Sequence, residues 1–513
     1  MNAASSDRHS ESATDLRRRL PPMDRLLNQP AIAALAEYYG RDAVRVQGRR
    51  ILQDIRQRIE LHQLDVATLD GEIDRFAQRL EADLHQRFGP PLARVLNATG
   101  IFLHTNLGRS PLAPEIVDAL VPLLTAGCDL EFDRDTGQRG DRNRRVGALL
   151  AELTGAEAAL VVNNNAAAMI LVLAVLARGR EVIVSRGELV EIGGSFRIPE
   201  ILAEAGAQLV EVGTTNRTRL ADYEAAIGDN TALLLKVYPS NYRIEGFTEE
   251  TSPAQLAQLA QRRSVPLLVD EGSGLLRPSQ RPQLRAHPSL QQLMQQGVDL
   301  ACGSGDKLAG GPQGGLLVGR RELITACRRH PLYRALRPHR GTLATLELTL
   351  RRHLAGAPLP LDSLWPDPHH HRQRLDDFRR SLEHSGVESV ELIDADAFLG
   401  GGSAPEAPVP GQAIALRGSQ KLLHRLRAGS PSVVGYLRQE RLILDLRTIA
   451  PQDDEALLGA ILAAKTAPRA HSSTPSEAQQ LVPEAPRAAP EDAAEQVPEG
   501  QHLTPSPAST SRP

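Results

Sequence analysis

The sequence predicts an α/β protein whose largest domain is a parallel β-sheet with helices on both faces. Between about residue 94 and residue 345, short apolar runs alternate with segments of helix length. This alternation is typical of a parallel sheet covered on both sides. In such sheets ligands bind at the carboxyl ends of the strands. The strand-like runs are AALVV at 158–162, EVIVS at 181–185, AQLVEV at 207–212, ALLLKV at 232–237 and PLLVD at 266–270.

The chain before the sheet is expected to form two parts. Residues 1–14 are polar and lack the apolar core of a signal peptide, so we predict a disordered segment. Residues 15–90 show helical periodicity interrupted by prolines and a glycine, which predicts a small helical domain. Residues 15–58 carry ten arginines against five acids. Charge alone fits either a solvated helical face or a surface for nucleic-acid phosphates.

The sheet domain is assigned to residues 91–345, and a smaller α+β domain to residues 346–465. Within the smaller domain, the run HHH at 369–371 is expected in a solvated loop. Three adjacent side chains cannot easily converge on one ion, so no metal site is predicted. Residues 466–513 hold nine prolines and no aromatic residue, which predicts a disordered tail.

The composition excludes several classes of protein. The formal net charge of the 513 residues is -3, so any nucleic-acid contact requires a local basic patch. Cys128, Cys302 and Cys327 lie far apart, which indicates reduced thiols and neither a disulfide framework nor a zinc site. No apolar run is long enough to span a bilayer. We therefore expect a soluble, cytoplasmic protein with no membrane contact.

Three polar features follow predicted strands. Asn163, Asn164 and Asn165 come after the first run and begin a helix. Free backbone amides at a helix start suit a phosphate, although an ordinary N-cap fits equally well. Asp270 ends another run, either as a turn former or as a ligand group. Lys307 lies among glycines in GSGDKLAGGPQGG, and glycines let a ligand approach the backbone closely.

These groups together predict a site for pyridoxal phosphate. A lysine in a partly desolvated pocket loses proton affinity and becomes a nucleophilic amine, so Lys307 is predicted to carry the cofactor as a Schiff base. Asp270 is predicted to pair with the pyridinium nitrogen, and the asparagine turn to hold the phosphate. From the residues alone, the alternative is an unrelated α/β enzyme with Lys307 on its surface.

Several long segments resemble one family, the bacterial selenocysteine synthases, or L-seryl-tRNA(Sec) selenium transferases. The segments include VLNATGIFLHTNLGRSPL, TGAEAALVVNNNAAAMILVL, LLLKVYPSNYRIEGFT, SGDKLAGGPQGGLLVG and HPLYRALR. The resemblance covers residues from about 15 to 465. It implies a fold-type-I pyridoxal-phosphate enzyme with a mainly parallel seven-stranded sheet, cytoplasmic and assembled as a homo-oligomeric ring, usually a decamer. The family's cofactor lysine corresponds to Lys307, and Ser304 in the same segment is expected to bind the cofactor.

The chain departs from the family pattern in three places. Gly314 stands where a small alanine is usual. The segment VDEGSG replaces VDLGSG, which puts Glu271 at a leucine position, and RGDRNRRV replaces RGSRYDHV. None of these changes removes a group that the cofactor needs.

The resemblance implies conversion of L-seryl-tRNA(Sec) to L-selenocysteinyl-tRNA(Sec), with selenophosphate as the selenium donor. The implied reaction is β-elimination of the seryl hydroxyl and selenium addition to an aminoacrylyl intermediate, with Lys307 as general base and acid. Arg109, Arg334 and Arg337 are candidates for binding the donor anion, because guanidinium groups suit phosphate oxygens. Residues 15–90 resemble the family's tRNA-binding domain.

Two alternatives remain at this stage. A related pyridoxal-phosphate lyase acting on a small amino acid or sugar acid would resemble the family only in the catalytic domain, whereas this chain also has the basic domain. A catalytically inactive tRNA-binding protein would not need Lys307 and Asp270. For the residue that stacks on the cofactor ring, Phe196 and His104 are candidates.

Overall fold

The computed structural model describes residues 13–89, 92–192, 196–239, 242, 244–403 and 407–466. Most of the predicted disordered ends, residues 1–12 and 467–513, lie outside these residues, whereas the first helix begins at Ala13. The chain divides into two compact units, which are described separately. The first contains residues 1–96 and 427–433, and the second contains residues 97–426 and 434–513.

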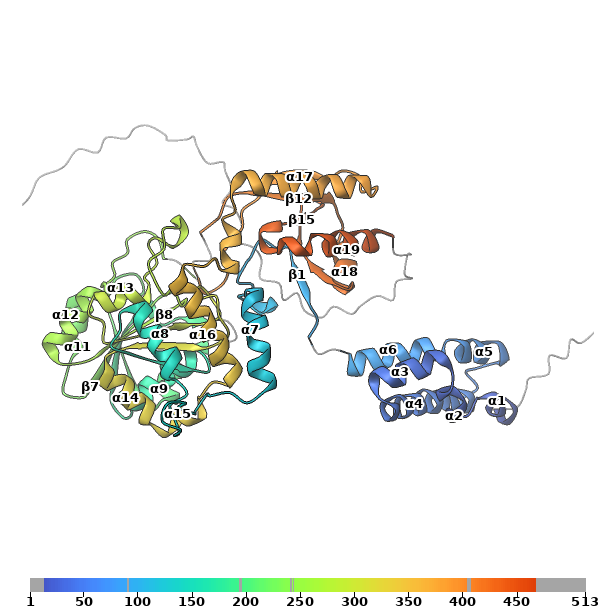
Figure 1. Cartoon of the computed structure of the whole chain (residues 1–513), viewed down its shortest axis with the longest axis horizontal. Coiled ribbons are helices and arrows are strands. Elements are labelled where there is room, and N and C mark those ends of the chain that lie inside the picture. The colour runs from blue at the N-terminus through green and yellow to red at the C-terminus, as the bar shows by residue number, and fades with distance from the viewer. Residues whose placement is uncertain are drawn as a thin grey trace, which may run out of the picture. The chain divides into compact units, whose positions relative to one another are not determined.

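Helices α1–α6 form the first unit (Figure 1). They are α1 (Ala13–Arg19), α2 (Met23–Leu27), α3 (Pro30–Tyr39), α4 (Arg41–Glu60), α5 (Val66–Asp74) and α6 (Phe76–Phe88). The long helix α4 buries Val44, Ile51 and Ile55 in a core shared with Phe76 and Leu80 of α6. This spacing of apolar residues puts one stripe of α4 inside and leaves its other faces to charged side chains. Strand β1 (Val95–Asn97) pairs with β13 (Ser432–Val434).

A seven-stranded sheet forms the centre of the second unit, in the order β2-β10-β9-β8-β7-β3-β6. Only β10 runs antiparallel to its two neighbours; the other pairs are parallel. The α/β class and the mainly parallel seven-stranded sheet are therefore confirmed. The strands are β2 (Ala158–Val162), β3 (Glu181–Ser185), β6 (Gln208–Val212), β7 (Thr231–Val237), β8 (Leu267–Gly272), β9 (Leu300–Ser304) and β10 (Gly315–Gly319), with the short pair β4 (Glu191–Ile192) and β5 (Phe196–Arg197) outside the sheet.

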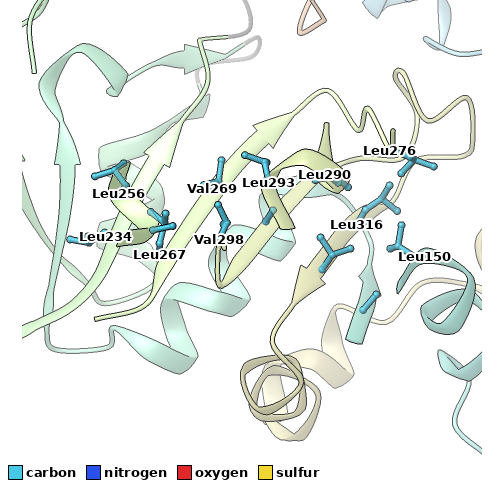
Figure 2. Packing of buried hydrophobic residues seen from close by; sticks show 14 of the residues in the cluster. Leu150, Leu234, Leu256, Leu267, Val269, Leu276, Leu290, Leu293, Val298 and Leu316 are labelled. Atoms are coloured by element: carbon cyan, nitrogen blue, oxygen red, sulfur yellow. The ribbon is translucent and has the colours of Figure 1, made fainter. Parts of the chain in front are cut away.

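Both faces of this sheet are buried under helices, which explains why its strands are continuous apolar runs. On one face, Leu234, Leu267 and Val269 pack against Leu256 and Leu293 of the covering helices (Figure 2). That face is covered by α8 (Arg144–Thr154), α11 (Leu220–Ala226), α12 (Pro253–Arg263), α13 (Leu290–Gln295) and α16 (Arg340–Ala355). The other is covered by α9 (Asn165–Leu176), α10 (Ile198–Glu204), α14 (Arg321–Arg329) and α15 (Pro331–Ala335). Helix α7 (Pro114–Thr125) packs against α16.

A four-stranded antiparallel sheet in the order β11-β12-β15-β14 follows the large sheet in the sequence. Its strands are β11 (Glu391–Asp394), β12 (Gln412–Arg417), β14 (Tyr436–Arg438) and β15 (Arg441–Leu444). The same part of the chain contains the helices α17 (Pro368–His384), α18 (Gln420–Ala428) and α19 (Asp454–Thr466). The domain boundary proposed at residue 345 lies inside α16.

The loop predicted for the histidine run is wrong. Residues 369–371 lie in the first turn of α17, because Asp367 caps this helix by accepting a hydrogen bond from the amide of His370. His371 is buried and contacts the carbonyl oxygen of Gln412. The side chains of Asp367, His369 and His370 are exposed, with potential ligand atoms within 4.8 Å of one another. Across the described residues, no helix combines the length and apolarity needed to cross a membrane.

Candidate active site

The predicted site residues lie at one edge of the large sheet. Lys307 lies in the turn after β9, and Asp270 lies on the neighbouring parallel strand β8. Strand β10 begins between the carboxyl ends of β2 and β9, where Gly315 pairs with both Val162 and Ser304. This edge therefore brings together the asparagine turn after β2, Ser304 and the lysine turn.

Lys307 is buried, with 6% of its surface exposed. Its Nζ donates hydrogen bonds to the carbonyl oxygens of Gly272, at 3.0 Å, and Gly402, at 3.3 Å. Gly402 has a φ of +82°, and a Cβ there would collide with the Lys307 amine. Only glycine therefore lets this backbone approach the amine so closely.

Two buried lysines of the chain differ in their electrostatic surroundings. Burial lowers the pKa of Lys307, with a further lowering by Arg109, and the nearby carboxylates do not compensate. Burial alone would also lower the pKa of Lys236, on β7, but Glu188 and Glu250 together raise it above its ordinary value. The Lys236 Nζ lies 2.9 Å from Glu188 Oε1 in an ion pair. Lys236 is thus held as a cation by its carboxylate partners, whereas the lowered pKa of Lys307 gives this amine a larger neutral fraction.

Asp270 is a buried carboxylate with one strong donor. The Asn165 side-chain amide donates to Oδ1 at 2.7 Å, and the Cys302 thiol lies 3.7 Å from the same oxygen. Burial raises the pKa of Asp270, opposed by the Asn165 hydrogen bond and the charge of Lys307. Burial also raises the pKa of Cys302 well above its ordinary value, so this thiol is not a thiolate nucleophile.

The three asparagines differ in their contacts. The Asn164 side chain caps α9 by accepting from the Ala167 amide, at 2.8 Å. With its amide oriented to donate, the Asn163 nitrogen lies 3.0 Å from the carbonyl oxygen of Leu336 and 3.1 Å from that of Arg337. Asn165 instead contacts Asp270. Among the described residues, the first-turn amides of Asn165 and Ala166 have no acceptor and remain the phosphate candidates at this edge.

Arg109 lies beside the lysine turn. Its guanidinium NH1 lies 3.2 Å from Asp306 Oδ2, and the backbone amide of Ser110 donates to the Asp306 carbonyl oxygen, at 3.2 Å. Arg109 adopts a φ of +63°, which a non-glycine residue holds only when neighbouring contacts stabilise it. The structure therefore places Arg109 next to Lys307, through the residue that precedes the lysine.

The other two candidate arginines differ from each other. Arg337 is half-buried, with NH1 3.4 Å from Glu131 Oε1. Its buried Nε has no partner among the residues that the structure describes. Its backbone contacts Asn163, so it lies near the carboxyl end of β2. Arg334 on α15 is exposed and has no partner for its guanidinium among the described residues.

Other buried polar atoms near these residues also lack partners. Asn165 Oδ1, His104 Nδ1 and the Ser403 hydroxyl have none in the part of the chain that the structure describes. Ser403 follows Gly402, whose carbonyl binds the Lys307 amine. The Gly402–Ser403 segment could not be predicted as part of the site, because no sequence motif links it to the lysine. For the ring-stacking candidates, burial lowers the pKa of His104, and the Phe196 side chain lies outside the described residues.

Comparison with known proteins identifies the family. The family model described as L-seryl-tRNA selenium transferase matches residues 95–450, which include the whole site. The chain belongs to the L-seryl-tRNA selenium transferase family. A second family model, described as selenocysteine synthase N terminal, matches residues 17–56.

Curated members of the family are similar over nearly their whole length. The L-seryl-tRNA(Sec) selenium transferase of Moorella thermoacetica is 44% identical, over 88% of this chain and 97% of its own. The L-seryl-tRNA(Sec) selenium transferase of Serratia proteamaculans is 42% identical, over 88% of this chain and 100% of its own. Among solved structures, a D-glucosaminate-6-phosphate ammonia-lyase shares the fold, with a TM-score of 0.53 and 22% identity over 74% of this chain and 97% of that one.

Proposed function

We propose that this chain converts L-seryl-tRNA(Sec) to L-selenocysteinyl-tRNA(Sec) with pyridoxal phosphate as cofactor. The observation that carries the proposal is Lys307, a buried amine of lowered pKa within the region matched by the family model. The curated relatives are named for this reaction and are aligned over 88% of the chain.

The residues at the sheet edge fit pyridoxal phosphate. Lys307 would hold it through the amine, and Asp270 would pair with the ring nitrogen, because a buried carboxylate favours a cation beside it. The unpartnered Asn165 Oδ1 and Ser403 hydroxyl are consistent with a polar ligand that completes their hydrogen bonds. The first turn of α9 and Ser304 would hold the phosphate. When bound, the cofactor supplies an aldehyde that condenses with amines and a ring that withdraws electrons from an amino acid α-carbon.

The chain's own residues then perform acid–base and positioning steps. A lowered pKa gives Lys307 a larger neutral fraction near pH 7, so its Nζ can accept the α-proton of the seryl group and return a proton. Asp270 is almost fully buried, so a negative charge on it would act strongly on a cation bound beside it. Arg109 would supply a fixed cation near the amine, and Arg337 would supply one near the carboxyl end of β2. Both guanidinium groups suit an anionic donor such as selenophosphate.

Helices α1–α6 are proposed to bind the tRNA, as the domain of residues 15–90. Arg49 and Arg56 of α4 are seven positions apart, so they lie on the same face. Both are exposed and have no side-chain partner within the described residues. Unpaired arginines on one helix face are suited to RNA phosphates. Residues 91–345 and 346–465 would form the catalytic and the small domain of a cytoplasmic, ring-shaped homo-oligomer.

Turnover of three seryl substrates tests the function. With selenophosphate, we expect seryl-tRNA(Sec) to be converted, and seryl-tRNA(Ser) and free serine to be converted at least about 100-fold more slowly in kcat/KM, because a substrate without the recognised RNA loses binding energy. Formation of the selenium-containing product is measured for each. Equal use of free serine would contradict the tRNA substrate and favour a lyase acting on small molecules.

The same assay tests the face of α4 that carries Arg49 and Arg56. The R49A/R56A variant is expected to raise the KM for seryl-tRNA(Sec) and to reduce its salt dependence, because each lost phosphate contact lowers the salt slope by about one. The R329A/K421A variant removes the same charge from exposed positions on α14 and α18 and is expected to keep the original KM. Equal effects of the two double variants would argue against this face.

The site for the selenium donor is tested at Arg337. The R337A variant is expected to raise the KM for selenophosphate by about 10-fold or more, since a charge-assisted hydrogen bond contributes about 1.5–3 kcal/mol. Its kcat is expected to change much less. The matched control is R329A, an exposed arginine of α14. An unchanged KM in R337A would leave the ion pair with Glu131 as the only role of this arginine.

A further inference from the structure

Glu271 is a fully buried carboxylate beside the turn that binds the Lys307 amine. It follows Asp270 on β8 and is 0% exposed. An ionised carboxylate without partners costs several kcal/mol to bury, so its surroundings must compensate. The mechanism described above gives this side chain no role.

Three donors compensate for the burial. The Ser273 hydroxyl donates to Glu271 Oε1, and the Gly274 amide donates to Oε2, at 2.6 Å. His287 Nε2 lies 2.9 Å from Oε1 and 2.9 Å from Ser273 Oγ. A carboxylate only accepts hydrogen bonds, and the serine proton is directed at it, so Nε2 carries a proton and donates to both oxygens.

This cluster is not a second nucleophilic site. In a hydrolytic triad, the two ring nitrogens of the histidine contact different partners, one the acid and the other the serine. Here a single nitrogen of His287 contacts both Glu271 and Ser273. Ser273 is also 0% exposed, so no substrate reaches its hydroxyl. The cluster therefore holds the backbone rather than attacking a ligand.

The turn closed by Glu271 contacts the lysine segment at two points, the Lys307 amine and the backbone amide of the next residue. The Gly272 carbonyl accepts from Lys307 Nζ at 3.0 Å, and the Ser273 carbonyl accepts from the Leu308 amide at 3.0 Å. Gly274 has a φ of +73°, and a Cβ there would collide with the Ser304 carbonyl oxygen. The Gly274 amide that Glu271 binds thus lies where the turn packs against the end of β9.

The charges that act on Lys307 come from several elements. Burial and Arg109 lower its pKa, whereas Asp270, Glu271 and Asp306 raise it. Asp270 has a proposed partner in the cofactor, and Asp306 is paired with Arg109. Among the described residues, the hydrogen bonds of Glu271 come from the turn and from His287.

We propose that Glu271, held by His287 and Ser273, is a positioning residue for the Lys307 amine. It fixes the Gly272 carbonyl that binds the amine, and its carboxylate is one of the charges that act on the amine. The proposal rests on the proposed function only for the use that it assigns to Lys307.

Amine labelling tests this proposal without the cofactor. The chain has four lysines, Lys236, Lys307, Lys421 and Lys465. Peptide mass spectrometry therefore resolves reductive methylation by formaldehyde and cyanoborohydride at each of them. In the cofactor-free E271Q and E271L variants, the midpoint of Lys307 labelling against pH is expected to move to lower pH. At neutral pH, the labelling rate of Lys307 is expected to rise by about threefold, which corresponds to a shift of the midpoint by about half a pH unit. The exposed Lys421 and Lys465 are internal references and stay unchanged.

The control variant is E188Q, which removes another buried carboxylate of this unit, the partner of Lys236. It is expected to change the labelling of Lys236 and to leave the Lys307 midpoint in place. An unmoved Lys307 midpoint in both Glu271 variants, or the same shift in E188Q, would overturn the proposal. Loss of cooperative unfolding in both Glu271 variants would also overturn it, since Glu271 would then serve the whole fold. Failure of the proposed function has a separate readout: borohydride would then trap no pyridoxal phosphate on Lys307 of the wild-type protein.

Discussion

The Lys307→Ala variant is expected to lose about 1,000-fold or more of its turnover of seryl-tRNA(Sec), within the range for removal of a general acid–base group. It should also lose the visible absorbance of the bound cofactor and the adduct that borohydride traps. The reason is that Lys307 alone combines burial with a lowered pKa, whereas the other buried lysine, Lys236, is held as a cation by Glu188. Turnover, absorbance and the mass of the trapped peptide measure the effect.

Lys421→Ala is the matched control, because this lysine lies exposed on α18. It is expected to keep both the turnover and the trapped adduct of the wild type. With four lysines in the chain, the trapped peptide identifies the reacting amine directly. An adduct of undiminished yield in Lys307→Ala, on Lys236 or elsewhere, would refute the assignment of the cofactor lysine.

The architecture was largely predictable from local sequence patterns. Apolar runs such as AALVV and PLLVD became β2 and β8, because a strand buried on both faces needs no polar alternation. The number of strands came only from the resemblance to the family. The antiparallel direction of β10 could not be predicted from its own residues. It follows from the turn after Lys307, which brings the chain back beside β9.

The groups around Lys307 were predictable only in part. Asp270 lies near the end of β8 and the asparagine turn follows β2, so the strand pattern located them at one edge of the sheet. Gly402 was not predictable, because its carbonyl reaches the amine from 95 positions away in the chain. The histidine run lies in α17 and not in the predicted loop, because Asp367 caps the helix just before it. The distinct contacts of the three asparagines depend on side-chain geometry that sequence spacing does not contain.

The second large effect is expected for Asp270→Asn, which keeps the side-chain shape and removes the charge. We expect turnover to fall by about 100-fold or more, in the range for loss of one preorganised electrostatic contact in a water-excluded site. The cofactor should still be trapped on Lys307, because the amine and its contacts with Gly272 and Gly402 do not involve Asp270. Separate measurement of trapping and turnover thus distinguishes tuning of the cofactor from its attachment.

Cys302→Ala is the control for Asp270→Asn. The Cys302 thiol contacts the same carboxylate oxygen at 3.7 Å, from the next strand of the sheet. Its removal changes the packing around Asp270 but not the charge, so turnover is expected to stay within about threefold of the wild type, as for loss of a weak thiol contact. If Asp270→Asn stayed within the same limit, the buried carboxylate would be a structural partner of Asn165 and not the group that pairs with the ring nitrogen. A large loss in Asp270→Asn with a small one in Cys302→Ala requires that the charge itself, and not the packing around it, supports turnover.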